Sequence, residues 1–86
     1  MNLDAMEPDD LLDFCKEAAL QPTQVGRRLF PERPRGYVAA TEALATYAFN
    51  KAAAMTCRLK GRVAEAQRYE TICDRIYEAL PPFSRW

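Results

Sequence analysis

The chain has 86 residues, of which 49% are apolar, and its 12 basic and 12 acidic residues give a net charge of zero. This length allows one small domain with a modest core. Histidine is absent, which excludes a Cys–His or Ser–His catalytic pair, and the three glycines form no phosphate-binding loop. We therefore expect no catalytic residues and no cofactor.

The N-terminal sequence MNLDAMEPDD is acidic where a signal peptide would be basic and then apolar. No apolar stretch is long enough to cross a bilayer. Cys15, Cys57 and Cys73 are an odd number of cysteines at wide spacing, without a CxxC motif. This pattern favours buried reduced thiols over a disulfide framework or a zinc site. We expect a cytoplasmic protein with no membrane partner and no metal.

The first helix is predicted over residues 7–20. Pro8 suits the first helical position, and the acidic residues that follow it suit the positive end of the helix dipole. Asp9, Asp13 and Glu17 are four residues apart, so they share one face of this helix. Three carboxylates could hold a divalent cation loosely, but no EF-hand or Glu-x-x-His motif accompanies them. We interpret them as a solvated acidic face.

Residues 21–36 form a connector rich in arginine and proline. Thr23 is placed to cap a short helix that Gly26 and Pro31 would keep from passing Phe30. The segment RRLFPERPRG holds four arginines: Arg27, Arg28, Arg33 and Arg35. They could pair with the acidic first helix of the same chain or of a second copy, contact a partner protein, or bind nucleic-acid phosphates. The zero net charge favours the first role, because nucleic-acid-binding domains are usually strongly basic.

Two long helices are predicted over residues 37–60 and 62–80. The first is rich in alanine and carries a main apolar stripe (Val38, Thr41, Leu44, Ala45, Ala48, Ala52, Met55 and Leu59) and a weaker strip (Ala40, Ala43, Tyr47 and Ala54). A helix with two apolar sides indicates a central position with neighbours on both flanks. The second is amphipathic, with Val63, Ala66, Tyr69, Cys73, Ile76 and Leu80 on one face. The short turn at Gly61 requires the two helices to be antiparallel neighbours.

The segment GRVAEAQRYE, with Gly61, Ala66 and Tyr69, resembles the turn and second helix of one tetratricopeptide repeat. The resemblance covers about thirty residues and implies only a helical hairpin. A peptide-binding groove of that family needs about three stacked repeats, and this chain has one hairpin. No binding residues follow from the resemblance.

The tail LPPFSRW ends the chain with two aromatic residues, Phe83 and Trp86. One interpretation is that residues 81–86 fold back and close the open end of the hairpin. The other is a docking peptide, because aromatic and arginine side chains are favoured binding hot spots.

The sequence therefore predicts one all-α domain over residues 1–86: a long antiparallel helical hairpin with an N-terminal helix packed across it, a small three-helix bundle. We expect a non-catalytic protein–protein interaction module, such as an adaptor, an inhibitor or an accessory subunit. Its partner would be another protein or a second copy in a homodimer. The alternative is a nucleic-acid-binding module that uses the arginine-rich connector. The candidate contact residues are Arg27, Arg28, Arg33, Arg35, Phe83 and Trp86.

Overall fold

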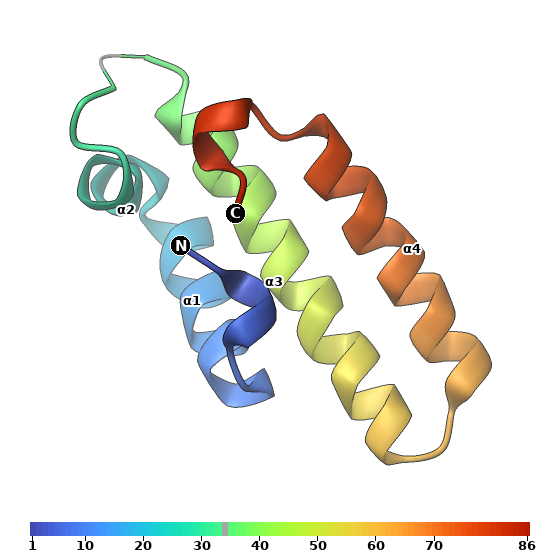
Figure 1. The fold of residues 1–86 in the computed structure, drawn as a ribbon. Helices are drawn as coiled ribbons and strands as arrows, with labels where there is room; N and C mark the ends of the chain where they lie inside the picture. Colours follow the sequence, from blue (N-terminus) through green and yellow to red (C-terminus); the bar gives the residue numbers. More distant parts are fainter. Residues whose placement is uncertain (34) are drawn as a thin grey trace.

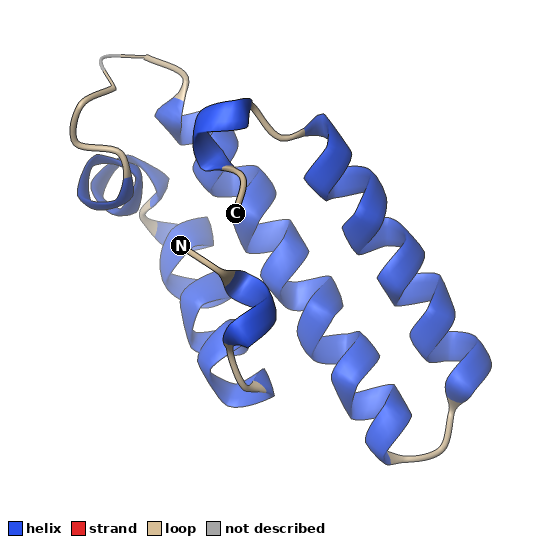
Figure 2. Cartoon of the chain, in the orientation of Figure 1, coloured by secondary structure: helices blue, strands red, loops and turns tan. Residues whose placement is uncertain are grey.

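The computed structural model describes residues 1–33 and 35–86. These residues form four α-helices and two short 3₁₀ turns, with no strand among them (Figure 2). The helices are α1 (Pro8–Leu20), α2 (Pro22–Leu29), α3 (Tyr37–Leu59) and α4 (Val63–Ala79); the turns are η1 (Leu3–Ala5) and η2 (Pro82–Ser84). The predicted all-α class, with a long hairpin and an N-terminal helix packed on it, is confirmed.

The two long helices α3 and α4 form the antiparallel hairpin. Gly61 lies in the turn with a φ of +75°, a left-handed conformation that glycine adopts without steric cost. Arg58 of α3 donates two hydrogen bonds to the Glu70 carboxylate of α4, at 2.5 and 2.7 Å. Nearer the middle, the Cys73 thiol of α4 donates to the backbone carbonyl of Tyr47 at 3.7 Å. The turn and these cross-contacts fix the register of the hairpin.

Helix α1 packs on the other flank of α3, so α3 lies between α1 and α4 in one layer (Figure 1). This is the arrangement expected for a central helix that is apolar on two sides. The buried residues of α1 and α3 in the shared core are Leu11, Phe14, Ala18, Leu44, Ala45, Tyr47, Ala48 and Ala52. The alanines on α3 allow the flanking helices to approach closely.

Both chain ends cross one face of this layer. In Figure 1, η1 lies in front of α1 and beside α3, and the C-terminal turn η2 lies in front of the first part of α3. Leu3 of η1 and Leu80, at the end of α4, are both fully buried or nearly so. The chain ends therefore form a second layer of packing on this face.

The connector contains a complete short helix, α2, which begins two residues earlier than a cap at Thr23 would allow. Pro22 occupies its first turn and Gln21 its N-cap, so the expectation that Thr23 caps it was wrong. Proline is favoured at the first helical position because its missing N–H would be unpaired there anyway. A Cβ on Gly26 would lie 2.5 Å from the Tyr37 ring and 2.8 Å from the Thr41 hydroxyl. Glycine at this position lets α2 pack directly against α3.

Two residues assigned to apolar stripes are exposed. Leu59 is 83% exposed and Val63 is 48% exposed. Both lie at the turn end of the hairpin, and α1, with 13 residues, is too short to flank all 23 residues of α3. Helical spacing correctly gives the side of a helix on which these residues lie. It does not say whether a neighbouring helix extends that far.

Candidate protein-interaction surface

Arg28, in the last turn of α2, pairs with the carboxylate of Glu17 on α1. The two side chains are 65% and 48% exposed, so solvent screens the pair and it adds little to stability. This contact is of the kind expected for arginines that face the acidic first helix. It uses one of the four arginines.

Arg33 lies against the aromatic tail instead of a carboxylate. Its guanidinium carbon is 4.1 Å from the centroid of the Phe83 ring, a cation–π contact. The same ring meets Phe30 edge to face, with 5.1 Å between the ring centroids. Phe83 therefore joins the connector to η2 within the chain.

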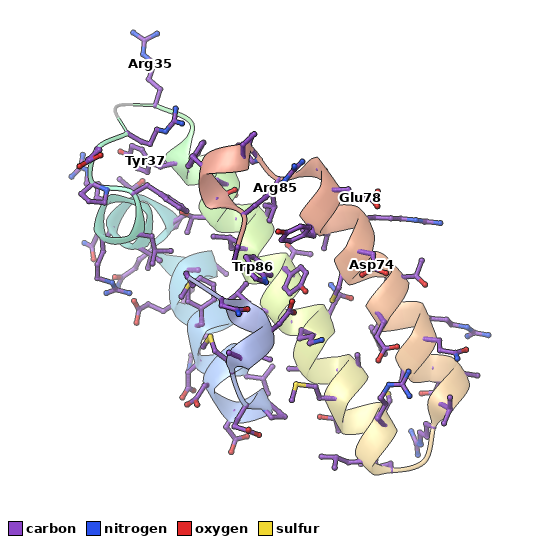
Figure 3. All side chains as sticks on the ribbon, viewed as in Figure 1. Arg35, Tyr37, Asp74, Glu78, Arg85 and Trp86 are labelled. Carbon is purple, nitrogen blue, oxygen red and sulfur yellow. The ribbon has the colours of Figure 1, made fainter. Side chains whose placement is uncertain are left out.

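Arg27 and Arg35 are exposed. In Figure 3 the Arg35 side chain extends away from the rest of the molecule. Neither makes an ion pair within residues 1–33 and 35–86. The four arginines thus have three different surroundings: an ion pair, an aromatic ring and open solvent.

Trp86 folds back onto the hairpin. Its ring packs edge to face on Tyr47 and on Tyr77, with 4.9 Å between the centroids in each pair. The Tyr77 hydroxyl donates to the backbone carbonyl of Trp86, which fixes the last residue of the chain. Within the chain, the tail has the internal role that was one of its two interpretations.

Asp4 of η1 contacts both Trp86 and the residues of α3 beneath it. Its carboxylate accepts hydrogen bonds from the Tyr47 hydroxyl at 2.5 Å and from the Trp86 indole at 3.0 Å, and it pairs with Lys51 at 3.6 Å. Burial disfavours the ionised carboxylate, but the two hydrogen bonds and the Lys51 charge together lower the pKa of Asp4. We call the five side chains Asp4, Tyr47, Lys51, Tyr77 and Trp86 the clasp.

Burial, followed by the hydrogen bond to Asp4, also raises the pKa of Tyr47. No pattern in the sequence indicated this cluster. Asp4 is 43 residues from Tyr47 and 82 residues from Trp86, so no local pattern joins them. Asp4 was simply one more residue of an acidic N-terminus.

A hollow of about 320 Å³ adjoins the clasp and is lined by Asp4, Asp74, Tyr77, Glu78 and Trp86. Figure 3 shows Asp74 and Glu78 on α4 and Trp86 over the middle of the layer. Within the described ranges, no three or more acidic or cysteine side chains are grouped so as to hold a metal ion. This result includes the acidic stripe of α1.

The other face of the layer is uncovered. Phe49 is two residues after Tyr47, which places it about 200° further around α3. Phe49 is 51% exposed, whereas Tyr47 is 5% exposed. Leu12 of α1 is 45% exposed beside it, and Ile72 of α4 is 39% exposed.

Two shallow hollows meet at Phe49. The first has a volume of about 350 Å³ and lies between α1 and α3, where Cys15 and Glu42 also line it. The second, of about 230 Å³, has residues of α1, α3 and α4 in its lining, including Leu12, Cys57 and Tyr69. We call this surface the open face and define it by Leu12, Cys15, Phe49, Ala53, Cys57 and Tyr69.

All three cysteines are free, but only Cys73 is buried. Cys15 and Cys57 are half-buried on the open face, so the expectation that all three thiols are buried was wrong for these two. Burial raises the pKa of Cys73 to about 11, which makes it a poor nucleophile at neutral pH.

None of the helices in the described residues is long and apolar enough to cross a membrane. Comparison of the chain with known protein families, curated proteins and solved structures gave no match. The two faces of the helical layer are therefore the features from which a function can be inferred.

Proposed function

We propose that this chain is a non-catalytic helical protein–protein interaction module, acting as an adaptor, an inhibitor or an accessory subunit, and that its partner docks on the open face. One observation supports this most strongly. Phe49 is half-exposed near the middle of α3, where two hollows meet and residues from α1, α3 and α4 line them. An apolar patch that is exposed and has polar residues at its margin is typical of an interaction site.

The chemistry of the open face suits another polypeptide. Phenylalanine and tyrosine are enriched in the buried centres of protein interfaces, and polar residues form the rim. Here Phe49 and Tyr69 supply aromatic area, and small residues such as Ala53 leave space around them. Glu42 lies at the margin of the first hollow. The reduced cysteines support a cytoplasmic location for this interaction.

The proposal is tested with a photoreactive amino acid placed at position 49 in cells that make this chain. We expect adducts that proteases destroy and nucleases leave intact. The matched control carries the same group at Leu20, which is 71% exposed. Leu20 is nine residues after the buried Leu11, so it points away from α3 and should give few adducts. Equal adduct yields at the two positions, or no polypeptide adduct at position 49, would contradict the proposal.

Nucleic-acid binding is the second candidate, and the solvent-exposed side chains of Arg27 and Arg35 favour it. Arginine at such positions can pair with phosphate. This function requires binding to mixed-sequence DNA or RNA that weakens steeply with salt. Changing both residues to alanine should then abolish most of that binding, as measured by fluorescence anisotropy. If no binding occurs at low salt, this candidate is excluded.

A further inference from the structure

We infer that the occupant of the open face is a second copy of this chain, in a two-fold dimer whose two α3 helices run in the same direction. This inference depends on the proposed function, because it uses the same face. It adds the identity of the partner and the orientation of the two copies. The charges on the two edges of the helical layer support it.

The outer edge of α1 is acidic on the side away from α3. Asp9 and Asp13 lie two residues before and two residues after the buried Leu11, so each is about 200° around the helix from the core. Both are exposed. Lys16 lies near them and reduces this negative charge without reversing it.

The outer edge of α4 is basic, as the same angular offset from buried residues indicates. Arg68 and Arg75 each follow a buried residue, Ala66 and Cys73, by two positions. Both arginines therefore point away from α3. Arg68 also lines a shallow hollow with Tyr69 and Ile72, which continues the open face outward. Glu65 lines the same hollow and leaves the edge basic overall.

A two-fold axis parallel to α3 places α1 of one copy over α4 of the other. The acidic edge of each copy then meets the basic edge of its partner, twice in each dimer. A two-fold axis across α3 would instead bring acid against acid and base against base. Glu42 opposes this arrangement, because its two copies approach each other along the paired α3 helices. We expect Glu42→Gln to strengthen association for this reason.

The size of the molecule allows such an interface. The Cα atoms extend over 43, 23 and 18 Å along the three principal axes. A standard interface buries about 800 Å² on each partner, which a face bounded by the two longer dimensions can supply. The dimer would place Phe49 against Phe49 of the second copy, and so cover the largest exposed aromatic side chain at the centre of the face.

The first test is the molar mass of the purified full chain by size-exclusion chromatography with light scattering. We expect twice the chain mass of 9.8 kDa at high concentration. Phe49→Asp should weaken association at least about tenfold, because it removes a central aromatic anchor. Leu20→Asp should leave it unchanged. A monomer at all concentrations, larger open-ended assemblies, or a dimer that tolerates Phe49→Asp would overturn the inference.

Charge reversal tests the orientation. Asp9→Arg with Asp13→Arg should weaken the dimer, and so should Arg68→Glu with Arg75→Glu, because each makes the facing edges alike. All four changes in one chain should restore it. In the opposite orientation the four changes would leave like charges facing each other, and no recovery would follow. Circular dichroism of each variant shows whether it is folded.

The thiols of the open face give a second readout that needs no mutation. Cys15 and Cys57 should be alkylated more slowly as the protein concentration rises, because the second copy covers them. The Phe49→Asp variant should lose this dependence. A monomeric chain with concentration-independent alkylation overturns the dimer. The proposed function still stands in that case if position 49 crosslinks to a different polypeptide, and it fails with the dimer if position 49 gives no polypeptide adduct.

Discussion

Tyr47 and Phe49 are two residues apart on the same helix, yet one is 5% and the other 51% exposed. Tyr47 lies on the face that η1 and the tail cross, where Asp4 and Trp86 contact it. Phe49 lies on the open face, where no described segment of the chain covers it. The two aromatic residues show that burial here depends on where the chain ends go.

The two faces also differ in what they contribute: the clasp stabilises the fold, whereas we propose that the open face binds a partner. The clasp uses side chains from both ends of the sequence, so it closes the molecule on itself. The open face has aromatic and apolar residues that the fold leaves in solvent at the cost of hydrophobic stabilisation. We therefore expect substitutions in the clasp to change folding and substitutions on the open face to change association.

The largest expected effect on folding is that of Trp86→Ala. Removing a large aromatic side chain from a core costs about 3–5 kcal/mol, and half-burial places Trp86 near the lower value. The change also removes both ring contacts, to Tyr47 and Tyr77. Urea denaturation measures the loss. Phe49→Ala is the matched control and should cost under about 1 kcal/mol. Equal losses in the two variants would mean that the clasp does not stabilise the fold.

A smaller effect is expected for Asp4→Ala. It leaves the Tyr47 hydroxyl and the Trp86 indole without their acceptor, which costs about 1–3 kcal/mol for a buried polar group. Asp74→Ala is the control, because Asp74 lines the same hollow and accepts no side-chain hydrogen bond from the described residues. Thermal unfolding of the two variants should separate them by several degrees. Comparable melting temperatures would show that the hydrogen bonds of Asp4 do not stabilise the clasp.

The clasp should also weaken in acid. The folded-state pKa of Asp4 lies below its ordinary value of 3.8, so its ionised form stabilises the folded state. That contribution is complete above the unfolded-state pKa and is lost as the pH falls through the folded-state pKa. The stability difference between the wild type and Asp4→Ala should therefore be constant at neutral pH and shrink below about pH 4. A difference that is unchanged at pH 3 would show that the carboxylate charge is not involved.

The contrast between the two faces explains how much of the structure the sequence could predict. Pro8, Gly61 and the alanine-rich run around Ala48 act locally, so they indicated the helices, the turn and the central place of α3. Helical spacing also placed Tyr47 on an apolar strip. The hydrogen bond between Asp4 and Tyr47 depends on how the chain ends cross the layer, which no local pattern encodes.

The arginines illustrate the same limit. Arg28 and Arg35 look alike in the sequence, because both belong to one basic segment. Their surroundings differ only because α2 packs where Arg28 can reach Glu17, while Arg35 follows on the exposed part of the connector. The open face was missed for a related reason. Phe49 belongs to neither apolar stripe of α3, so helical spacing did not mark it as part of a surface.

The smallest expected effect is on thiol reactivity, which reports on the side of the layer that carries the clasp. Cys73 is buried beside the Tyr47 carbonyl, with a pKa of about 11, so its thiolate is scarce at pH 8. Mass spectrometry of alkylated protein at low concentration should show rapid modification of Cys15 and Cys57 and slow modification of Cys73.

Trp86→Ala should then raise the rate at Cys73 and leave the rates at Cys15 and Cys57 nearly unchanged. Releasing the tail exposes the side of α3 next to Cys73, and local opening of this kind requires less free energy than global unfolding. Phe49→Ala should leave the slow rate at Cys73 as it is. If Trp86→Ala accelerated all three thiols together, the protein would be opening as one unit, and the two faces would not be energetically separate.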